Sequence, residues 1–293
     1  MEIVVTPEEL ANEQLSTAHV QAAVASIQTD GYVILADVIA HSHLDIVRER
    51  MAEDSRTLIA AQKWGGAGQI QGHLQQGPPP FAPYIFRDIV ANPFAIQVTT
   101  AVLGAGAYNR FYNGNANTPG SGTQPLHADT PHLWPDLRVA HPAHALVVNV
   151  TLIDATAENG ATEIWPGTHL LPFEKQHINA ELEAARRALV PPIQAIARKG
   201  SIVIRDMRMW HRGVPNQSNE VRHMIAMVHN IKWLQRPHAL LFNRGCENAF
   251  PAMDGFDHNA EFTDQPLEYL FTRTPTIISN AKPATTMRMD QRP

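Results

Sequence analysis

From residue 107 onward the chain consists mainly of short β-prone runs separated by turn residues. The runs cover residues 107–113, 145–153, 162–165, 201–205 and 223–232. Links such as Thr118-Pro-Gly-Ser-Gly122 and Glu158-Asn-Gly160 contain the residues that favour tight turns. Helices do not alternate regularly with these runs, which disfavours a parallel sheet built from strand, helix and strand units. The pattern predicts a mainly β chain with flanking helices, folded as a sandwich or barrel.

The helical segments are concentrated before this β region. Residues 7–28 carry apolar side chains at mixed spacings of three and four after Thr6-Pro7, which predicts one helix ended by Asp30-Gly31. Further helices are expected at about residues 42–61, 92–103 and 177–189, with a short strand at 32–35. Two helices around one strand would form an N-terminal layer.

One long segment without helical or β pattern lies within the N-terminal part. Residues 63–83 are rich in Gly, Gln and Pro, a composition that does not hold regular structure for long. Loops of this length inside a compact domain are often functional. We therefore consider two alternatives for it, a lid on the substrate side and a plain connector.

The length of 293 residues is compatible with a single β-rich domain. We expect an N-terminal helical layer with the lid-like loop at residues 1–105, a jelly-roll core at 106–235 and a C-terminal extension at 236–293.

Composition excludes several classes of protein. The chain is 44% hydrophobic and 17% charged with a formal net charge of -5, and its basic residues are scattered among acids, so no nucleic-acid partner is expected. Cys246 is the only cysteine, which excludes internal disulfides and favours a reducing compartment. The N-terminus lacks the pattern of a signal peptide, and the longest apolar stretch is too short to span a bilayer. These features predict a cytoplasmic protein without a membrane partner.

Three residues form a candidate metal site. His127 and Asp129 are two residues apart, so on an extended segment their side chains leave from the same face. His211 follows the β-prone run at 201–205. Two histidines and one carboxylate with an open opposite face are the arrangement of non-haem iron(II) oxygenases. A lone His-x-Asp pair is a weak signal in a chain with 15 histidines, so further support is needed.

Arg222 gives that support. It lies eleven residues after His211, near the start of the next β-prone run. There its guanidinium could bind the distal carboxylate of a keto acid bidentately while the other end of the keto acid chelates iron.

At this point the sequence resembles the phytanoyl-CoA dioxygenase family of 2-oxoglutarate oxygenases. The resemblance rests on three stretches: Leu126-His127-Ala128-Asp129, Glu158-Asn159-Gly160 running into Trp165-Pro166-Gly167-Thr168-His169, and His211 through Asn216 to Arg222. It implies a double-stranded β-helix core with N-terminal helices.

The resemblance also implies the chemistry. His127, Asp129 and His211 would bind Fe(II), Arg222 would bind the carboxylate of the cosubstrate 2-oxoglutarate, and O2 would be the second cosubstrate. Asn149 is expected to contact the cosubstrate as well. Related enzymes that halogenate have a small residue in place of the carboxylate ligand, so Asp129 favours oxygenation.

The chain departs from the family pattern at Gly213, where the family often has a hydroxyl residue two positions after the distal histidine. Trp134, Trp210 and Asn113 are candidates for substrate contact, although tryptophan more often serves packing. The four histidines His132, His141, His144 and His169 are more often structural than ligating, and the same holds for His223 and His229.

The function predicted from these residues is an Fe(II)- and 2-oxoglutarate-dependent dioxygenase. It would hydroxylate, or desaturate, cyclise or epimerise, a small-molecule and biosynthetic natural-product substrate with release of succinate and CO2. Two alternatives use the same fold: a cupin-like metal isomerase or hydrolase that does not use 2-oxoglutarate, and a non-catalytic binding protein.

Overall fold

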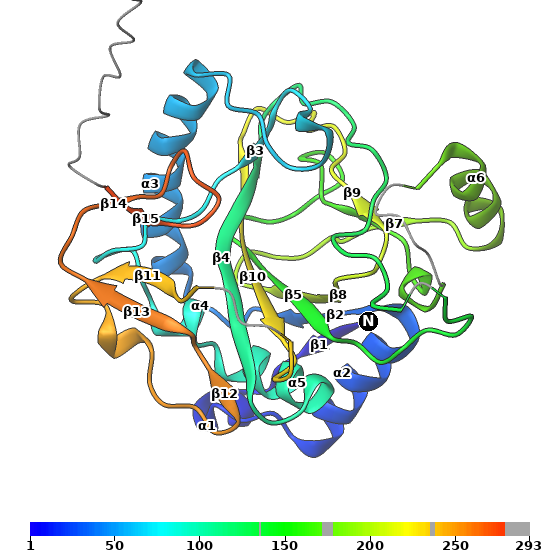
Figure 1. The fold of residues 1–293 in the computed structure, drawn as a ribbon, viewed down its shortest axis with the longest axis horizontal. Helices are drawn as coiled ribbons and strands as arrows, with labels where there is room; N and C mark the ends of the chain where they lie inside the picture. Colours follow the sequence, from blue (N-terminus) through cyan, green and yellow to red (C-terminus); the bar gives the residue numbers. More distant parts are fainter. Residues whose placement is uncertain (135, 172–177, 235–237, 279–293) are drawn as a thin grey trace, which may run out of the picture.

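The computed structural model describes residues 1–134, 136–171, 178–234 and 238–278. Its largest sheet has eight strands in the order β1-β2-β8-β5-β10-β4-β12, with β3 paired to β4 off this path (Figure 1). These strands are Glu2–Val4 (β1), Tyr32–Ala36 (β2), His73–Gln75 (β3), Ala107–Asn117 (β4), Ala145–Thr151 (β5), Ile202–Asp206 (β8), Arg222–Asn230 (β10) and Phe256–Asp257 (β12). A three-stranded sheet in the order β7-β6-β9 contains Ile193–Gln194 (β7), Glu163–Ile164 (β6) and His211–Arg212 (β9).

The central strands β5, β8 and β10 have two chemically different faces. One face belongs to the main hydrophobic core and contributes Leu146, Val148, Val150, Ile202, Ile204, Ile225 and Met227. The alternate residues line a cavity and are Val147, Asn149, Arg205, Met224, Ala226 and Val228. Because successive side chains of a strand point to opposite faces, one hydrocarbon face and one partly polar face follow directly from the sequence.

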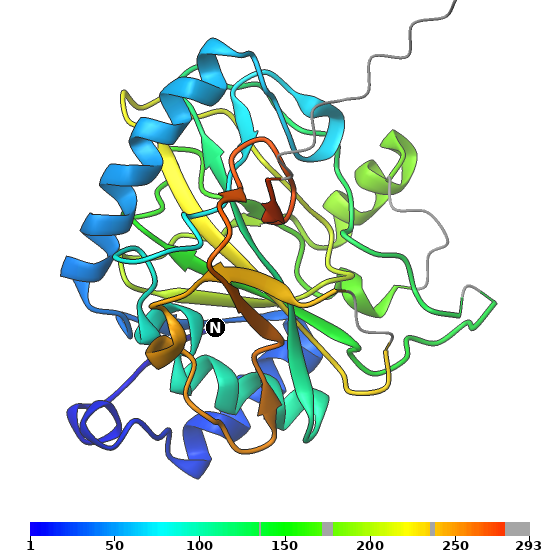
Figure 2. The ribbon, with the colours of Figure 1, turned by 60° about the vertical axis from the view of Figure 1, so that its left-hand side comes forward.

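Helices cover the core face. Their bounds are Pro7–Asn12 (α1), Thr17–Asp30 (α2), His41–Ala60 (α3), Arg87–Val90 (α4), Pro93–Leu103 (α5) and Ala180–Leu189 (α6), with 3-10 turns at Ala67–Gln69, Thr168–Leu170 and Glu247–Ala249. α2 and α5 lie together below the sheet, and α3 runs along its side (Figure 2). In the described part of the chain, no helix has both the length and the apolar character needed to cross a bilayer.

The expected fold class, mainly β with flanking helices, is confirmed. The single helix expected at residues 7–28 is wrong, because the segment forms two helices, α1 and α2. Glu13 adopts a left-handed conformation with φ 51° between them, and the Ser16 side chain caps α2 by accepting from the His19 amide. A side-chain cap of this kind supplies a partner for an amide that a new helix start leaves open.

Several strands were not expected from the sequence. β1 and β3 lie in the segment expected to be a helical layer and loop, yet both join the main sheet. The segment 236–293 contains β12 and four more strands: Leu240–Asn243 (β11), Ala260–Thr263 (β13), Leu267–Glu268 (β14) and Thr276–Ile277 (β15). Leu240 and Phe242 of β11 belong to the main core, so this segment packs against the sheet. Residues 279–293 of the expected C-terminal extension lie outside the described residues.

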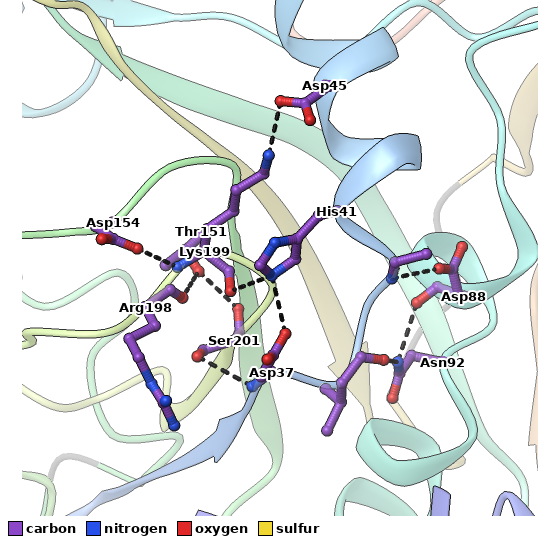
Figure 3. Close-up of polar contacts among 12 residues, drawn as sticks. Asp37, His41, Asp45, Asp88, Asn92, Thr151, Asp154, Arg198, Lys199 and Ser201 are labelled. Atoms are coloured by element: carbon purple, nitrogen blue, oxygen red, sulfur yellow. Dashed lines mark hydrogen bonds and ion pairs between the residues drawn. The ribbon is translucent and has the colours of Figure 1, made fainter. Parts of the chain in front are cut away.

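A polar network fixes the start of β8 against α3 (Figure 3). The Lys199 ammonium pairs with Asp45 at 2.7 Å, and the Lys199 amide donates to Asp154 at 2.7 Å. His41 links the Lys199 carbonyl, at 3.2 Å, to Asp37, at 2.9 Å. The network therefore holds the loop before β8 at a fixed position, which sets the register of that strand against its neighbours.

Two histidines of β10 are buried against helices on the core face. His223 Nε2 lies 2.8 Å from Ser55 Oγ on α3, and His229 Nδ1 lies 2.9 Å from Thr99 Oγ1 on α5. Burial lowers the pKa of His223 to about 4 and that of His229 to about 3, because the charged imidazolium loses its hydration there.

These lowered pKa values predict a loss of stability in mild acid. The unfolded chain binds protons on histidine below about pH 6.5, whereas these folded histidines stay neutral until about pH 4, so stability present at neutral pH falls through that window. We expect the double variant His223→Gln His229→Asn to lose less unfolding free energy than the wild type between about pH 7 and about pH 5. Urea unfolding at both pH values measures this, and equal losses in the two proteins would contradict it.

Candidate active site

The side chains of His127, Asp129 and His211 lie close together in the structure. An isolated bridge pairs the backbones of the two histidines: the His127 amide donates to the His211 carbonyl at 3.1 Å and the His211 amide donates back at 2.8 Å. The Asp129 amide donates to the Met207 carbonyl at 3.2 Å. One ligand atom from each of the three side chains lies within 4.8 Å of the others, an arrangement that could hold one metal ion.

Backbone carbonyls fix which nitrogen of each histidine faces the centre. His127 Nδ1 lies 2.8 Å from the Pro125 carbonyl, and His211 Nδ1 lies 3.1 Å from the Met209 carbonyl. Because a carbonyl oxygen only accepts, each Nδ1 carries the proton and each Nε2 presents a lone pair. Second-shell contacts of this type orient histidine ligands in metal sites.

Arg205 of β8 adds a cation beside this cluster. Its guanidinium donates to Asp129 Oδ2 at 2.6 Å and lies 3.2 Å from His211 Nε2. The other carboxylate oxygen, Asp129 Oδ1, lies 3.6 Å from His211 Nε2. The contact with Arg205 thus occupies one oxygen of Asp129 and leaves the other directed toward the histidines.

The charges around Asp129 decide its protonation. Desolvation would raise the pKa of Asp129, but Arg205 and the two histidines outweigh it and hold that pKa below its usual value. Burial is also the largest influence on His211, whose pKa lies well below its usual value. The cluster therefore presents the Asp129 carboxylate and the neutral His211 imidazole at neutral pH, the protonation states that metal binding requires.

A cavity of about 590 Å³ opens above the cluster. This size is typical of small-molecule sites. Among the described residues that line it, Asp129 is the one carboxylate, whereas the cations are Lys63, Arg110, Arg205, Arg222 and Arg273. Asn149, expected to contact the cosubstrate, also lines the cavity from β5. A chain with a net charge of -5 thus has a cationic interior site.

Arg222 is the cation of this set that lies deepest. Its side chain is 5% exposed, and burial lowers its pKa to about 10. Its Nε has no hydrogen-bond partner among the described residues, and its Nη1 lies 4.0 Å from Met224 Sδ. Because burying an unpaired charge is costly, an anion from outside the chain is the group that would balance it.

Gly213 leaves space for two other side chains. A Cβ at this position would lie 2.5 Å from His73 Cε1 and 2.8 Å from Gln124 Oε1. The Gly213 amide donates to that same Gln124 oxygen at 2.8 Å. His73 and Gln124, which both line the cavity, therefore occupy the position where the family often has a hydroxyl side chain.

The other candidates lie away from the cavity lining described above. Trp134 is 49% exposed and meets the ring edge of His141 at 5.3 Å. Trp210 is buried and packs against Trp165 with ring centroids 6.3 Å apart. Asn113 is buried, and its Nδ2 donates to the Arg273 carbonyl at 2.6 Å. The four histidines His132, His141, His144 and His169 are buried behind the cluster and also lie outside the lining.

Residues 27–224 match the family model of phytanoyl-CoA dioxygenase (PhyH), a span that contains the clustered triad and Arg222. The chain belongs to the phytanoyl-CoA dioxygenase family. The resemblance noted in the sequence is confirmed, and the match ends before most of β10 and the whole C-terminal segment.

Two curated relatives are named dioxygenases. The dioxygenase andF of Emericella variicolor is 28% identical over 144 residues, which covers 47% of this chain and 47% of that protein. The dioxygenase af480 of Aspergillus fumigatus is 26% identical over 216 residues, or 70% of this chain and 64% of that protein. The chain thus spans about half to just under two thirds of the length of these relatives.

Solved structures with a similar fold include two enzymes of nogalamycin biosynthesis. The α-ketoglutarate-dependent epimerase SnoN of nogalamycin biosynthesis has a TM-score of 0.54 at 19% identity, covering 73% of this chain and 82% of SnoN. The carbocyclase SnoK of the same biosynthesis has a TM-score of 0.54 at 22% identity, covering 74% and 85%. AviO1 of Streptomyces viridochromogenes has a TM-score of 0.55 at 20% identity, covering 76% and 100%.

Sequence reasoning missed Arg205 and Gln124. A signal for Arg205 was present, because an arginine within the buried run Ser201-Ile-Val-Ile-Arg205 needs a partner on the face opposite the isoleucines. Gln124 carried no comparable signal. Its role beside Gly213 depends on a contact between segments distant in sequence.

The short distances around Gly213 predict that a hydroxyl side chain at this position lowers the free energy of unfolding. We expect Gly213→Ser to lower the free energy of unfolding by about 1 to 3 kcal/mol, because its Cβ overlaps His73 and Gln124. In the double variant Gly213→Ser His73→Ala the loss should be smaller than the sum of the two single losses. Urea unfolding of the four proteins measures this; additive losses would mean that His73 is not the obstacle.

Proposed function

We propose that this protein is an Fe(II)- and 2-oxoglutarate-dependent dioxygenase that oxidises a small molecule. The observation that carries the proposal is Arg222, a buried guanidinium without a carboxylate partner among the described residues, in the same cavity as the triad. A dicarboxylate that chelates a metal at one end and pairs with arginine at the other fits both features.

The donor set fits Fe(II). Two neutral imidazoles and one carboxylate from one side suit this ion and leave positions open to exogenous ligands on the cavity side. When bound, Fe(II) and 2-oxoglutarate would supply the activation of O2, with oxidative decarboxylation to succinate and CO2 and oxidation of a C–H bond.

The side chains of the protein would position and protect these groups. His127 and His211 keep their Nε2 lone pairs directed to the centre through their Nδ1 contacts with backbone carbonyls. Arg205 restrains Asp129 to one oxygen toward the metal, which leaves room for a bidentate cosubstrate. Arg222 would hold the distal carboxylate, and Asn149 lines the cavity as a further hydrogen-bonding group.

The substrate we propose is a small natural-product molecule, with no nucleic acid or membrane as partner, in a cytoplasmic protein. The dioxygenase names of the two relatives and the biosynthetic setting of the similar structures support this choice. Hydroxylation is the proposed outcome, and Asp129 supports it because it fills the ligand position that a halide would need. Desaturation or cyclisation would give a product lighter by two hydrogens, and epimerisation a product of unchanged mass.

The pairing of Arg222 with 2-oxoglutarate predicts a specific binding defect. We expect Arg222→Gln to weaken 2-oxoglutarate binding to the anaerobic Fe(II) protein by at least about 30-fold, since removing one partner of a buried charge pair costs about 2 kcal/mol or more. Calorimetry measures this, and metal affinity in the same variant should change less than about twofold because Arg222 does not belong to the triad.

Matched variants separate the alternatives. Arg56→Gln removes an exposed charge on α3 outside the cavity and should leave 2-oxoglutarate binding unchanged. His127→Ala and Asp129→Ala should abolish both metal binding and substrate-dependent succinate formation. Metal binding with unchanged turnover in Arg222→Gln would favour a cupin-like isomerase or hydrolase, and failure to bind any divalent metal would favour a non-catalytic binding protein.

A further inference from the structure

The end of the cavity far from Arg222 combines residues inside the family match with residues that follow it. β10 and β4 pair with Arg222 opposite Asn117 at one end and Val228 opposite Phe111 at the other. Phe111 and Val228 line the cavity, together with residues 270–273 from the C-terminal segment. Val228 and that segment follow residue 224 and lie outside the family match, whereas Phe111 lies inside it.

The C-terminal segment is held firmly over the cavity. β14 and β15 pair antiparallel on either side of residues 270–273. The Asn113 side chain donates to the Arg273 carbonyl at 2.6 Å, and the Tyr269 hydroxyl donates to Asp54 of α3 at 2.8 Å. Figure 2 shows this red segment in front of the sheet, between α3 and the loop that carries the first 3-10 turn. Its side chains are therefore anchored parts of the cavity wall.

Two cations at this end have no acidic partner. The Arg273 guanidinium carbon lies 5.6 Å from the centroid of the Phe111 ring, and Arg110 precedes Phe111 on β4. Both arginines line the cavity and are exposed, and neither forms an ion pair with a described residue. Most other arginines of the described chain do pair with carboxylates; examples are Arg50, Arg87, Arg187, Arg212 and Arg244.

The wall beside these cations is mainly apolar. Val147 and Val228 form one hydrophobic cluster with Phe111 and Met207, and all four residues line the cavity. A ligand lying there would place an apolar body against this wall and an end group beside Arg110 and Arg273. The described lining residues at this end include no carboxylate. Both arginines would therefore attract a negative end group.

We propose that the substrate of this enzyme is an amphiphilic anion, an apolar molecule carrying a carboxylate or similar acidic group that Arg110 and Arg273 bind. This proposal rests on the proposed oxygenase function where it calls the ligand a substrate. The subsite itself is defined by the cavity and its charges. Phe111 supports the apolar body and, through its contact with Arg273, the orientation of the guanidinium.

A pair of fluorescent probes tests the subsite without turnover. Anilinonaphthalene sulfonate has an apolar body and an anionic group, and N-phenylnaphthylamine has the same body without that group. Both are titrated into the full chain loaded with Fe(II) and excess 2-oxoglutarate under anaerobic conditions, so that the Arg222 end is filled. We expect the sulfonate to bind about 10-fold more tightly than the neutral probe, as for a charge-assisted hydrogen bond, and less tightly at high salt.

Two double variants that each remove two arginine charges test whether Arg110 and Arg273 bind the sulfonate. The double variant Arg110→Gln Arg273→Gln should lose about 10-fold in affinity for the sulfonate and less than about twofold for the neutral probe. Arg56→Gln Arg138→Gln removes two exposed charges outside the cavity lining and should change neither. Dodecanoate should displace the bound sulfonate, and methyl dodecanoate should not.

Three results would overturn the proposal. They are equal affinity of the wild type for both probes, unchanged sulfonate binding in the Arg110→Gln Arg273→Gln variant, and loss of bound sulfonate when 2-oxoglutarate is added to Fe(II) protein first titrated without it, which would place the probe at Arg222. The probe titration does not depend on succinate formation. Failure of the oxygenase assay with intact probe selectivity would thus contradict the proposed function and leave the anion subsite standing.

Discussion

The two-faced character of the central strands is the constraint on which the rest of this structure depends. In β5, β8 and β10 most side chains on the helix-covered face are hydrocarbon, and β10 adds the buried His223 and His229 there, so these strands are fixed by core burial. The alternate positions are then free to carry polar and charged groups into the cavity. A shift of one residue in any of these strands would exchange the two sets, so the position of Arg205 and Arg222 in the cavity is secured by the isoleucines and valines beside them.

Electrostatics inside the cavity follow from this arrangement. The described lining holds five cations and one carboxylate, and Asp129 is already engaged by Arg205. Arg222 has lost most of its hydration without gaining a protein partner. Such a site is costly for the protein alone, and binding of anions would offset that cost. The proposed cosubstrate site at Arg222 and the proposed anion subsite at Arg110 and Arg273 would be two uses of the same positive cavity.

The chain consists of a part that the family model matches, residues 27–224, and a C-terminal segment beyond it. Residues 27–224 contain the triad, Arg205 and Arg222. Residues 270–273, which follow that span, also line the cavity. Gly213 illustrates the coupling between parts: His73 and Gln124 occupy the space that a larger residue would need, so a change at one position requires changes in two other segments.

The sequence by itself determined the fold class and the family, and it marked His127, Asp129, His211 and Arg222 as candidates, because these depend on local patterns. Period-two alternation, turn residues and the short motif around His127 and Asp129 can all be read within a few residues. The tertiary structure alone decided which candidates meet at the cavity. Trp134, Trp210 and Asn113 lie close in sequence to functional residues, yet they lie outside the lining, whereas Gln124 and residues 270–273 belong to it. The same limit applies to the short strands β1 and β3 and to the break between α1 and α2. Such features depend on contacts between segments far apart in the chain, and the energy of those contacts is absent from any local window of sequence.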